Sequence, residues 1–253
     1  MEIGDYAICH LTVVPVRISP DDTSEIITQL LFGEVVCILS IQNQWLQIEI
    51  THDTYKGWVD SKQFMPISKQ TAELIVTNPR QQDEVLPLQT PWGNQTILAG
   101  SPILSQNKNF QIEDFSYSWN EMAPVIREQN ISELALKYLN SPYLWGGRTC
   151  FGIDCSGFTQ TVYHQLGISL NRDASQQVLQ GKEVTFNNQR EGDLAFFRSE
   201  KSGKITHVGI ILENNTIIHA HGRVRIDTLK EEGIYNEKEK YFSHKLNCIK
   251  TFK

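Results

Sequence analysis

The pattern of apolar residues changes near residue 117, and this change most constrains the fold. Before it, short β-branched or alternating runs are separated by Gly, Pro and Asn, and Trp45–Ile50 alternates apolar with polar residues. Alternation is typical of half-buried strands, and strands at such close spacing predict small barrels. After it, helical spacing comes first and further strands follow. This order predicts an α+β domain preceded by β units.

The part before the change divides into two segments. Residues 1–66 are expected to form one small β domain, and residues 67–116 a second β unit with a weaker pattern. Short apolar runs in the second segment lie at 74–76, 85–88 and 96–100. Pro and Gly separate these runs, as expected for turns between strands. The α+β domain is then expected over residues 117–253.

Two helices are predicted in the third domain. Apolar residues at helical spacing cover 131–139, with Asn130 or Ser132 as the possible cap. A second helix is predicted from Cys155 to about Leu166, ending before Gly167. Strands are then expected at 194–197, 207–212 and 216–220.

Charge and hydropathy argue against two classes of partner. The net charge of −6 is unfavourable for binding nucleic acid or an anionic membrane. No apolar run approaches the roughly 18 residues of a membrane span. The start, Met1–Asp5, lacks the basic and apolar segments of a secretory signal, so a cytoplasmic protein is expected unless a leader was removed.

The five cysteines do not suggest a metal site or a disulfide framework. Their spacings are scattered and contain no C-x-x-C pair, so neither metal nor cofactor is expected. Cys155 differs from the other four cysteines in its predicted surroundings. It falls at the first turn of the predicted helix, directly after Asp154, a possible cap. The helix dipole there favours a thiolate, the nucleophilic form of cysteine. A buried structural cysteine remains the alternative on this argument alone.

A nucleophilic cysteine needs a base, and the base needs an orienting group. His207 opens one predicted strand and His219 closes the next. A two-residue turn between these strands would place the two rings on opposite faces. A three-residue loop, 213–215, pairs Leu212 with Thr216 and puts both histidines on one face. We therefore predict an odd loop, with His207 as base and His219 as its orienter.

The other histidines are less informative. His221 shares the strand parity of His219, so a place in the same cleft stays open. Ordinary surface or core positions are expected for His10, His52, His164 and His244. No role is assigned to Cys150.

Four segments together resemble a known family. Pro142–Gly147, Asp154–Phe158, His207–Ile210 and Ile218–Ala220 are similar to NlpC-type cell-wall peptidases, which are papain-like cysteine enzymes of bacteria. The resemblance implies a papain-like domain with the catalytic triad Cys155, His207 and His219. It also implies that four further side chains contact the substrate: Tyr143, Asp154, Ser156 and Ser175.

The first 66 residues resemble bacterial SH3-like domains through Glu25–Glu34 and Tyr55–Val59. Two such domains before the catalytic one resemble the layout of γ-D-glutamyl-L-diamino acid endopeptidases. This implies a murein peptide substrate such as L-Ala-γ-D-Glu-diamino acid, in which the diamino acid is diaminopimelate or lysine. It also implies that an acid and a tyrosine of the first domain, here Glu25 and Tyr55, bind the free amine of L-Ala. A monomer is expected.

Two alternatives stay open. One is another wall amidase or an acyl transferase that uses the same triad. The other is a wall-binding module without catalytic activity.

Overall fold

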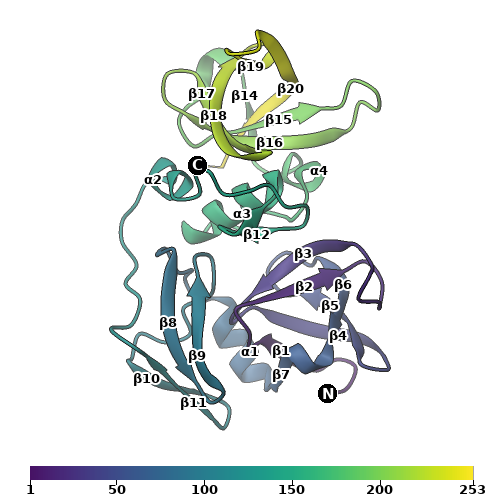
Figure 1. Cartoon of the computed structure of the whole chain (residues 1–253), viewed down its shortest axis with the longest axis vertical. Helices are drawn as coiled ribbons and strands as arrows, with labels where there is room; N and C mark the ends of the chain where they lie inside the picture. Colours follow the sequence, from purple (N-terminus) through teal and green to yellow (C-terminus); the bar gives the residue numbers. More distant parts are fainter. Residues whose placement is uncertain (253) are drawn as a thin grey trace. The chain divides into compact units, whose positions relative to one another are not determined.

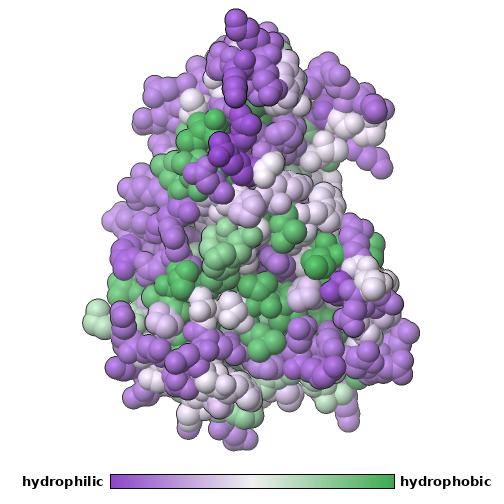
Figure 2. Space-filling view, in the orientation of Figure 1, coloured by the Kyte–Doolittle hydropathy of each residue, from purple (hydrophilic) through white to green (hydrophobic). Residues whose placement is uncertain are grey.

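The computed structural model describes residues 1–252 and divides into two compact units, Met1–Glu128 and a second that begins at Gln129. Figure 1 shows the elements of each unit. Hydrophilic side chains cover much of the visible surface of both (Figure 2). Within the described residues, no helix combines the length and the apolar character that crossing a membrane requires.

The first 67 residues form a seven-stranded antiparallel sheet with strand order β3-β2-β6-β5-β4-β1-β7. The strands are β1 (Tyr6–Cys9), β2 (Val13–Arg17), β3 (Ile26–Leu31), β4 (Val35–Gln42), β5 (Trp45–Ile50), β6 (Lys56–Asp60) and β7 (Phe64–Ile67), with a 3-10 turn at Ser61–Gln63. Leu46, Ile48 and Ile50 are buried in its core, as their alternation predicts. The β prediction for this segment is confirmed.

The next segment contains one helix and a four-stranded sheet with strand order β10-β11-β8-β9. Its elements are α1 (Lys69–Val76), β8 (Val85–Thr90), β9 (Gly93–Leu98), β10 (Asn109–Ile112) and β11 (Phe115–Trp119). The β interpretation of the run at 74–76 is wrong, because this run ends helix α1. Ser68 caps the helix by accepting a hydrogen bond from Thr71 N, and Ala72 and Ile75 are buried on one side of it.

The two sheets of this unit share one core. Ile8 and Phe32 of the first segment belong to the same buried cluster as Leu88 and Trp119 of the second. The compact unit therefore continues past residue 66 and extends to Glu128.

The second unit begins with its helices. They are α2 (Ile131–Leu136), α3 (Cys155–Gln165) and α4 (Ala174–Gln177), and a short hairpin of β12 (Arg148–Thr149) and β13 (Gly152–Ile153) precedes α3. Asn130 and Glu133 form a capping box at the start of α2. This helix ends at Leu136 rather than at 139, because the next N–H groups bond three residues back and Asn140 has a φ of 71°.

Helix α3 agrees with its prediction at both ends. Asp154 caps its start through Gly157 N, and Gly167 follows its end with a φ of 75°. Every residue of α3 is buried. The helix packs against β16 and β17.

The sheet of this unit closes on itself. Its strands are β14 (Lys182–Val184), β15 (Leu194–Arg198), β16 (Ile205–Leu212), β17 (Thr216–His221), β18 (Arg223–Lys230), β19 (Gly233–Asn236) and β20 (Tyr241–Thr251), with a 3-10 turn at Phe186–Asn188. Because β20 pairs with both β15 and β19, the strands from β15 to β20 form a six-stranded barrel (Figure 1). The strands predicted at 194–197, 207–212 and 216–220 are confirmed as β15, β16 and β17.

Strand parity explains what fills this barrel and what lies at its end. Phe197, Ile211 and Ile217 belong to one buried cluster on one face of the sheet. His207 lies opposite Phe197 in the register, and His219 is two residues beyond Ile217 on the same face. The apolar core thus gives way to imidazole rings at one end of the barrel.

Candidate active site

The Cys155 side chain lies at the first turn of α3 and is 6% exposed. Its sulfur receives backbone hydrogen bonds from Val208 and Ser156. Val208 directly follows His207 on β16, so the thiol lies beside the strand that carries the predicted base.

A buried ion pair holds the loop before Cys155. Asp154 accepts hydrogen bonds from Gly146 N at 2.8 Å and from Gly157 N at 2.7 Å. Arg172 binds both carboxylate oxygens, at 3.0 and 2.5 Å, and also donates to Ser156 Oγ at 3.0 Å. This bidentate pair fixes the start of α3. The chain comes close here, because a Cβ at Gly157 would lie 2.3 Å from Gly147 O.

These contacts bear on two predicted substrate residues. Asp154 and Ser156 are both buried, and both face Arg172. Their visible role is to hold the loop in place, and their contact with substrate stays a prediction. Sequence reasoning assigned no role to Arg172, because nothing local in the sequence shows that it returns to Asp154.

The hairpin between β16 and β17 has the predicted odd loop. Leu212 pairs with Thr216, and both Asn214 and Asn215 have positive φ values, of 56° and 54°. Gly209 leaves room for the second histidine, since a Cβ there would lie 2.8 Å from the Cβ of His219. The predicted register is therefore confirmed.

The two histidines are in direct contact. His207 Nε2 lies 2.8 Å from His219 Nδ1, with the rings at 83°. The structure extends this pair to a residue that sequence reasoning missed. His219 Nε2 lies 2.9 Å from Asp227 Oδ2, and the other oxygen of Asp227 accepts from Arg225 at 2.6 Å.

The carboxylate at the end of this chain fixes the tautomers. Asp227 accepts, so His219 carries its proton on Nε2 and presents an unprotonated Nδ1 to His207. His207 then donates from Nε2 and keeps Nδ1 unprotonated, as a base requires. Asp227 was hidden because its role depends on the register of β18, where it pairs with Ile217.

Burial determines the charge of the pair in the free protein. It raises the pKa of the Cys155 thiol to about 12, the charge of Asp154 adds to this, and the N–H of Val208 opposes it. Burial and the neighbouring rings of His219 and His244 hold the pKa of His207 well below its usual value. The helix dipole does not outweigh burial here. Thiol and imidazole are therefore both favoured in their neutral forms.

Asp227 remains ionised. Burial raises the pKa of its carboxyl, but the hydrogen bonds from His219 and Arg225 outweigh burial and place it below its usual value. Burial lowers the pKa of His219, although the bond to Asp227 acts in the opposite direction. A neutral His219 between the Asp227 carboxylate and His207 is thus the stable arrangement.

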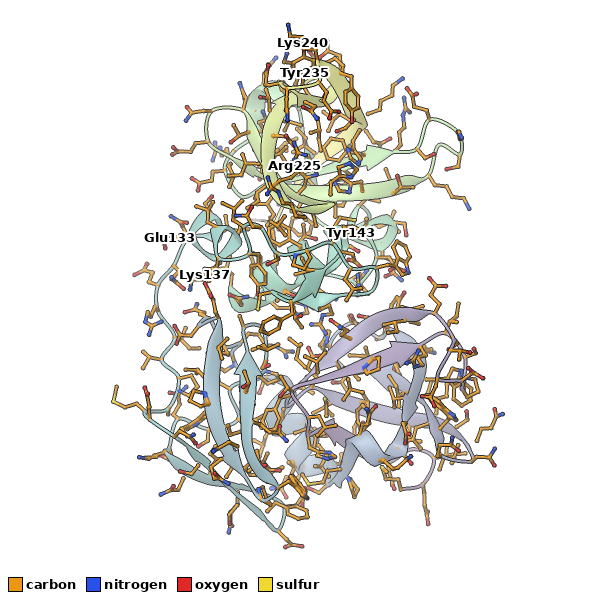
Figure 3. The ribbon with its side chains drawn as sticks, in the orientation of Figure 1. Glu133, Lys137, Tyr143, Arg225, Tyr235 and Lys240 are labelled. Carbon is orange, nitrogen blue, oxygen red and sulfur yellow. The ribbon has the colours of Figure 1, made fainter. Side chains whose placement is uncertain are left out.

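Tyr143 lies in the loop before β12 and is 37% exposed (Figure 3). Burial raises the pKa of its hydroxyl to about 12, and the nearby Cys155 and Asp154 add to this. The phenol therefore keeps its proton and can donate it in a hydrogen bond. Ser175 is exposed on α4, and the exposed His221 stacks beside His219 with ring centroids 6.2 Å apart.

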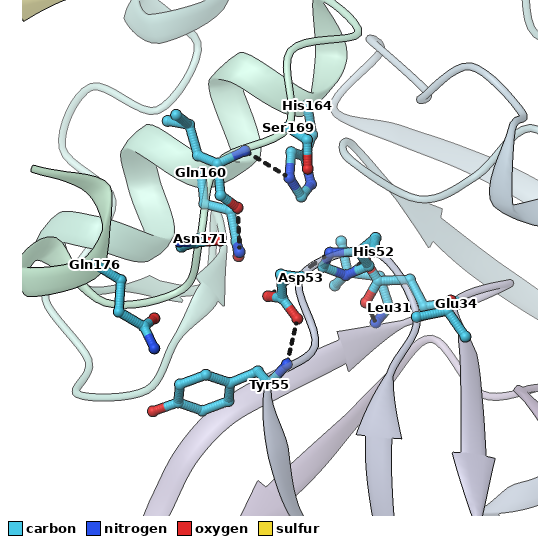
Figure 4. Close-up of polar contacts among 12 residues, drawn as sticks. Leu31, Glu34, His52, Asp53, Tyr55, Gln160, His164, Ser169, Asn171 and Gln176 are labelled. Carbon is cyan, nitrogen blue, oxygen red and sulfur yellow. Dashed lines mark hydrogen bonds and ion pairs between the residues drawn. The ribbon is translucent and has the colours of Figure 1, made fainter. Parts of the chain in front are cut away.

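The two predicted amine-binding residues lie in the first unit. Glu25 is exposed just before β3, and Tyr55 is half-buried just before β6. Tyr55 N donates to Asp53 at 3.0 Å (Figure 4). Their role in binding the substrate stays a prediction.

None of the five cysteines, all of which lie within the described residues, forms a disulfide bond. Within residues 1–252, no group of three or more His, Cys, Asp or Glu side chains has an arrangement suited to a metal ion.

Comparisons with known proteins now add to this geometry. Residues 140–245 match the model of the NlpC/P60 family. A probable endopeptidase of Haemophilus influenzae is 30% identical over 130 residues, which are 50% of this chain and 81% of that protein.

The chain belongs to the NlpC/P60 family.

The NlpC/P60 match spans the whole constellation from Tyr143 through Cys155 to Asp227. Residues 16–64 match the bacterial dipeptidyl-peptidase Sh3 domain, so the first predicted SH3-like domain is confirmed. The gamma-D-glutamyl-L-lysine dipeptidyl-peptidase of Bacillus subtilis is 29% identical over 221 residues, 76% of this chain and 71% of that protein.

A solved structure has the same fold. It is an NlpC/P60 family protein from Bacillus cereus, with a TM-score of 0.80 and 18% identity over 98% of this chain and 99% of that one. The papain-like architecture expected from the motifs is therefore present, with an SH3 domain before it.

Proposed function

We propose that this NlpC/P60 protein is a cysteine peptidase that hydrolyses the γ-D-glutamyl-L-diamino acid bond of murein peptides with a free N-terminal L-Ala, and that it serves wall-peptide recycling in the cytoplasm. The observation that carries the proposal is the hydrogen-bonded chain Asp227–His219–His207, which ends on β16 next to Val208, whose N–H bonds to the Cys155 sulfur. The similarity to a gamma-D-glutamyl-L-lysine dipeptidyl-peptidase supports this choice of substrate.

The reaction begins from neutral groups. His207 Nδ1 takes the thiol proton as Cys155 Sγ attacks the γ-carbonyl carbon of D-Glu. The imidazolium so formed is stabilised through His219 by the Asp227 carboxylate. It returns the proton to the amine of the diamino acid, which leaves. His207 then deprotonates a water that hydrolyses the thioester and restores the thiol.

Two donors serve the developing oxyanion. The backbone N–H of Cys155 lies at a helix start, where N–H groups lack intrahelical acceptors. The protonated hydroxyl of Tyr143 is the second candidate donor.

Selectivity for short peptides would come from the first unit. Glu25 and Tyr55 are the proposed ligands for the L-Ala amine, and Ser175 is a further contact on the catalytic domain. A second SH3-like fold for residues 67–116 belongs to the same proposal.

The test is cleavage of L-Ala-γ-D-Glu-L-Lys and of its diaminopimelate counterpart, with products identified by mass. The wild-type protein should release L-Ala-D-Glu, and Cys155→Ala should lose at least about 100-fold in kcat, because the nucleophile is gone. Cys150→Ala is the matched control and should cleave normally. Cleavage that survives in Cys155→Ala would refute the proposal.

The same experiment separates the alternatives. A transferase would yield adducts when an amine acceptor is added. A binding module would yield no product from any peptide.

A further inference from the structure

His244 lies against the proposed base, His207, and sequence reasoning did not predict this contact. It comes from β20, and its ring stacks on His207 with centroids 4.1 Å apart and planes at 25°. The prediction of an ordinary surface or core position misses this contact, because the closure of the barrel by β20 is what brings the two rings together.

The His244 ring is held on several sides. Ser243 Oγ lies 2.9 Å from its Nδ1. The Phe197 ring meets it edge-on at 6.0 Å, and the His221 ring is perpendicular to it at 4.8 Å.

The backbone at His244 is constrained as well. Gly233 on β19 has a φ of 150°, and a Cβ there would lie 1.9 Å from the carbonyl oxygen of His244. Only glycine allows β19 to come so close to β20. The fold thus fixes both the main chain and the ring of His244.

The titratable groups that face this ring are His207 on β16, His219 and His221 on β17, and Asp227 on β18. Charged side chains line the cavity beside it: Arg198 of β15, Glu200, Lys201, Glu232 and Lys245. Burial, followed by the neighbouring rings of His219 and His221, lowers the pKa of His244 to about 3. At neutral pH the stacked ring is therefore uncharged and does not repel the imidazolium that forms on His207.

His244 also lines a cavity of about 610 Å³, together with Arg198, Thr206, Glu232 and Lys245. One part of the His244 side chain thus faces this cavity, and another covers His207, which is 5% exposed. Removing the ring would let water from this cavity approach His207.

We propose that His244 is a positioning residue of the active site: its ring stacks on His207, holds Nε2 of His207 toward His219 and keeps water away from the proposed base. The inference rests on the proposed role of His207. It assigns to His244 no contact with the reacting atoms.

The test compares three variants in kcat, KM and pH profile with L-Ala-γ-D-Glu-L-Lys as substrate. His244→Leu should lower kcat by about 10- to 100-fold, because a loose base is misplaced, and should change KM little. On the acid side of the pH profile, kcat/KM of this variant should begin to decrease at a higher pH than that of the wild type. The reason is that hydration returns the pKa of His207 toward 6.5. His244→Phe keeps a flat ring and should retain most of kcat. Lys245→Ala, an exposed neighbour on β20, is the control.

The inference would be overturned if His244→Leu and the wild type had equal kcat and the same decrease of kcat/KM on the acid side of the pH profile. So would equal losses in the Leu and Phe variants at matched melting temperatures, because they would indicate mere packing. If His244→Leu does not fold, the test rests on the apparent pKa of the acid-side decrease in kcat/KM of His244→Phe. A value equal to that of the wild type supports the inference, and a value raised to near 6.5 overturns it.

A second measurement does not depend on the substrate. The rate at which iodoacetamide alkylates Cys155, followed by peptide mass against pH, also reports the state of His207. If the wild-type protein cleaves none of the peptides, the proposed function fails. A changed alkylation profile in His244→Leu would still support the role of His244, and an unchanged one would overturn it.

Discussion

Asp227 determines which atoms donate in the hydrogen-bond chain, although His219 and His207 lie between it and the Cys155 thiol. Its Oδ2 accepts a hydrogen bond from the N–H at His219 Nε2, and its Oδ1 accepts one from Arg225. A carboxylate can only accept, whereas an amide can also donate. The carboxylate therefore excludes the wrong tautomer of His219, and in the proposed reaction it would offset the positive charge on His207.

Asp227→Asn tests this role at the level of one atom. The amide can turn its NH₂ toward His219, which would leave His207 without a proper acceptor, so kcat should fall by about 100-fold, the lower range of general-base effects. KM should be nearly unchanged in steady-state kinetics. Arg225→Gln, which leaves the Oδ2 contact in place, should lose far less. Wild-type kcat in a folded Asp227→Asn protein would contradict the chain.

Among the elements, the β16–β17 hairpin does most to build the site. Its loop length determines which face His219 occupies, and Gly209 provides the space for that ring. The face of His219 was predictable, because side-chain alternation and a loop count need no tertiary knowledge. Helix α3 was predictable for the same reason, since Asp154 and Gly167 are local signals for its ends.

Three residues of the site could not be predicted, because their roles depend on contacts between elements distant in the sequence. Arg172 returns to Asp154 across a loop, Asp227 depends on the register of β18, and His244 depends on the closure of the barrel. The run at 74–76 misled for a related reason. Three apolar residues fit a strand or a helix equally well, and the cap at Ser68 decides between them.

Gly209→Ala tests the hairpin as an element. The added Cβ would lie 2.8 Å from the Cβ of His219 and from Cδ1 of Ile217, so overpacking should cost about 1–3 kcal/mol in urea unfolding and should also lower kcat. Gly203→Ala is the matched control. Its Cβ meets open space at a φ of 67°, so it should cost about 1–2 kcal/mol and leave kcat intact. Equal activity of the two variants would argue against the packing role of Gly209.

At the scale of the whole molecule, the cluster of imidazole rings makes stability depend on pH. Burial is the first cause that lowers the pKa values of His207, His219 and His244 in the folded unit. In the unfolded chain all three return to about 6.5. Below that pH these histidines bind protons in the unfolded chain but stay unprotonated in the folded unit. The stabilisation present above pH 6.5 is therefore lost as the pH falls.

We therefore expect the unit that begins at Gln129 to lose stability between pH 7.5 and 5.5. Each fully buried histidine contributes at most about 1.4 kcal/mol per pH unit below 6.5. Urea unfolding at the two pH values, followed by hydrogen exchange in peptides from β16 to β18, measures the change in this unit alone. His244→Phe removes one titrating ring and should flatten the dependence by up to one histidine's share, whereas Lys245→Ala should not. Equal unfolding free energies at both pH values would mean that the rings are hydrated in solution, and the neutral resting state of the base would then be wrong.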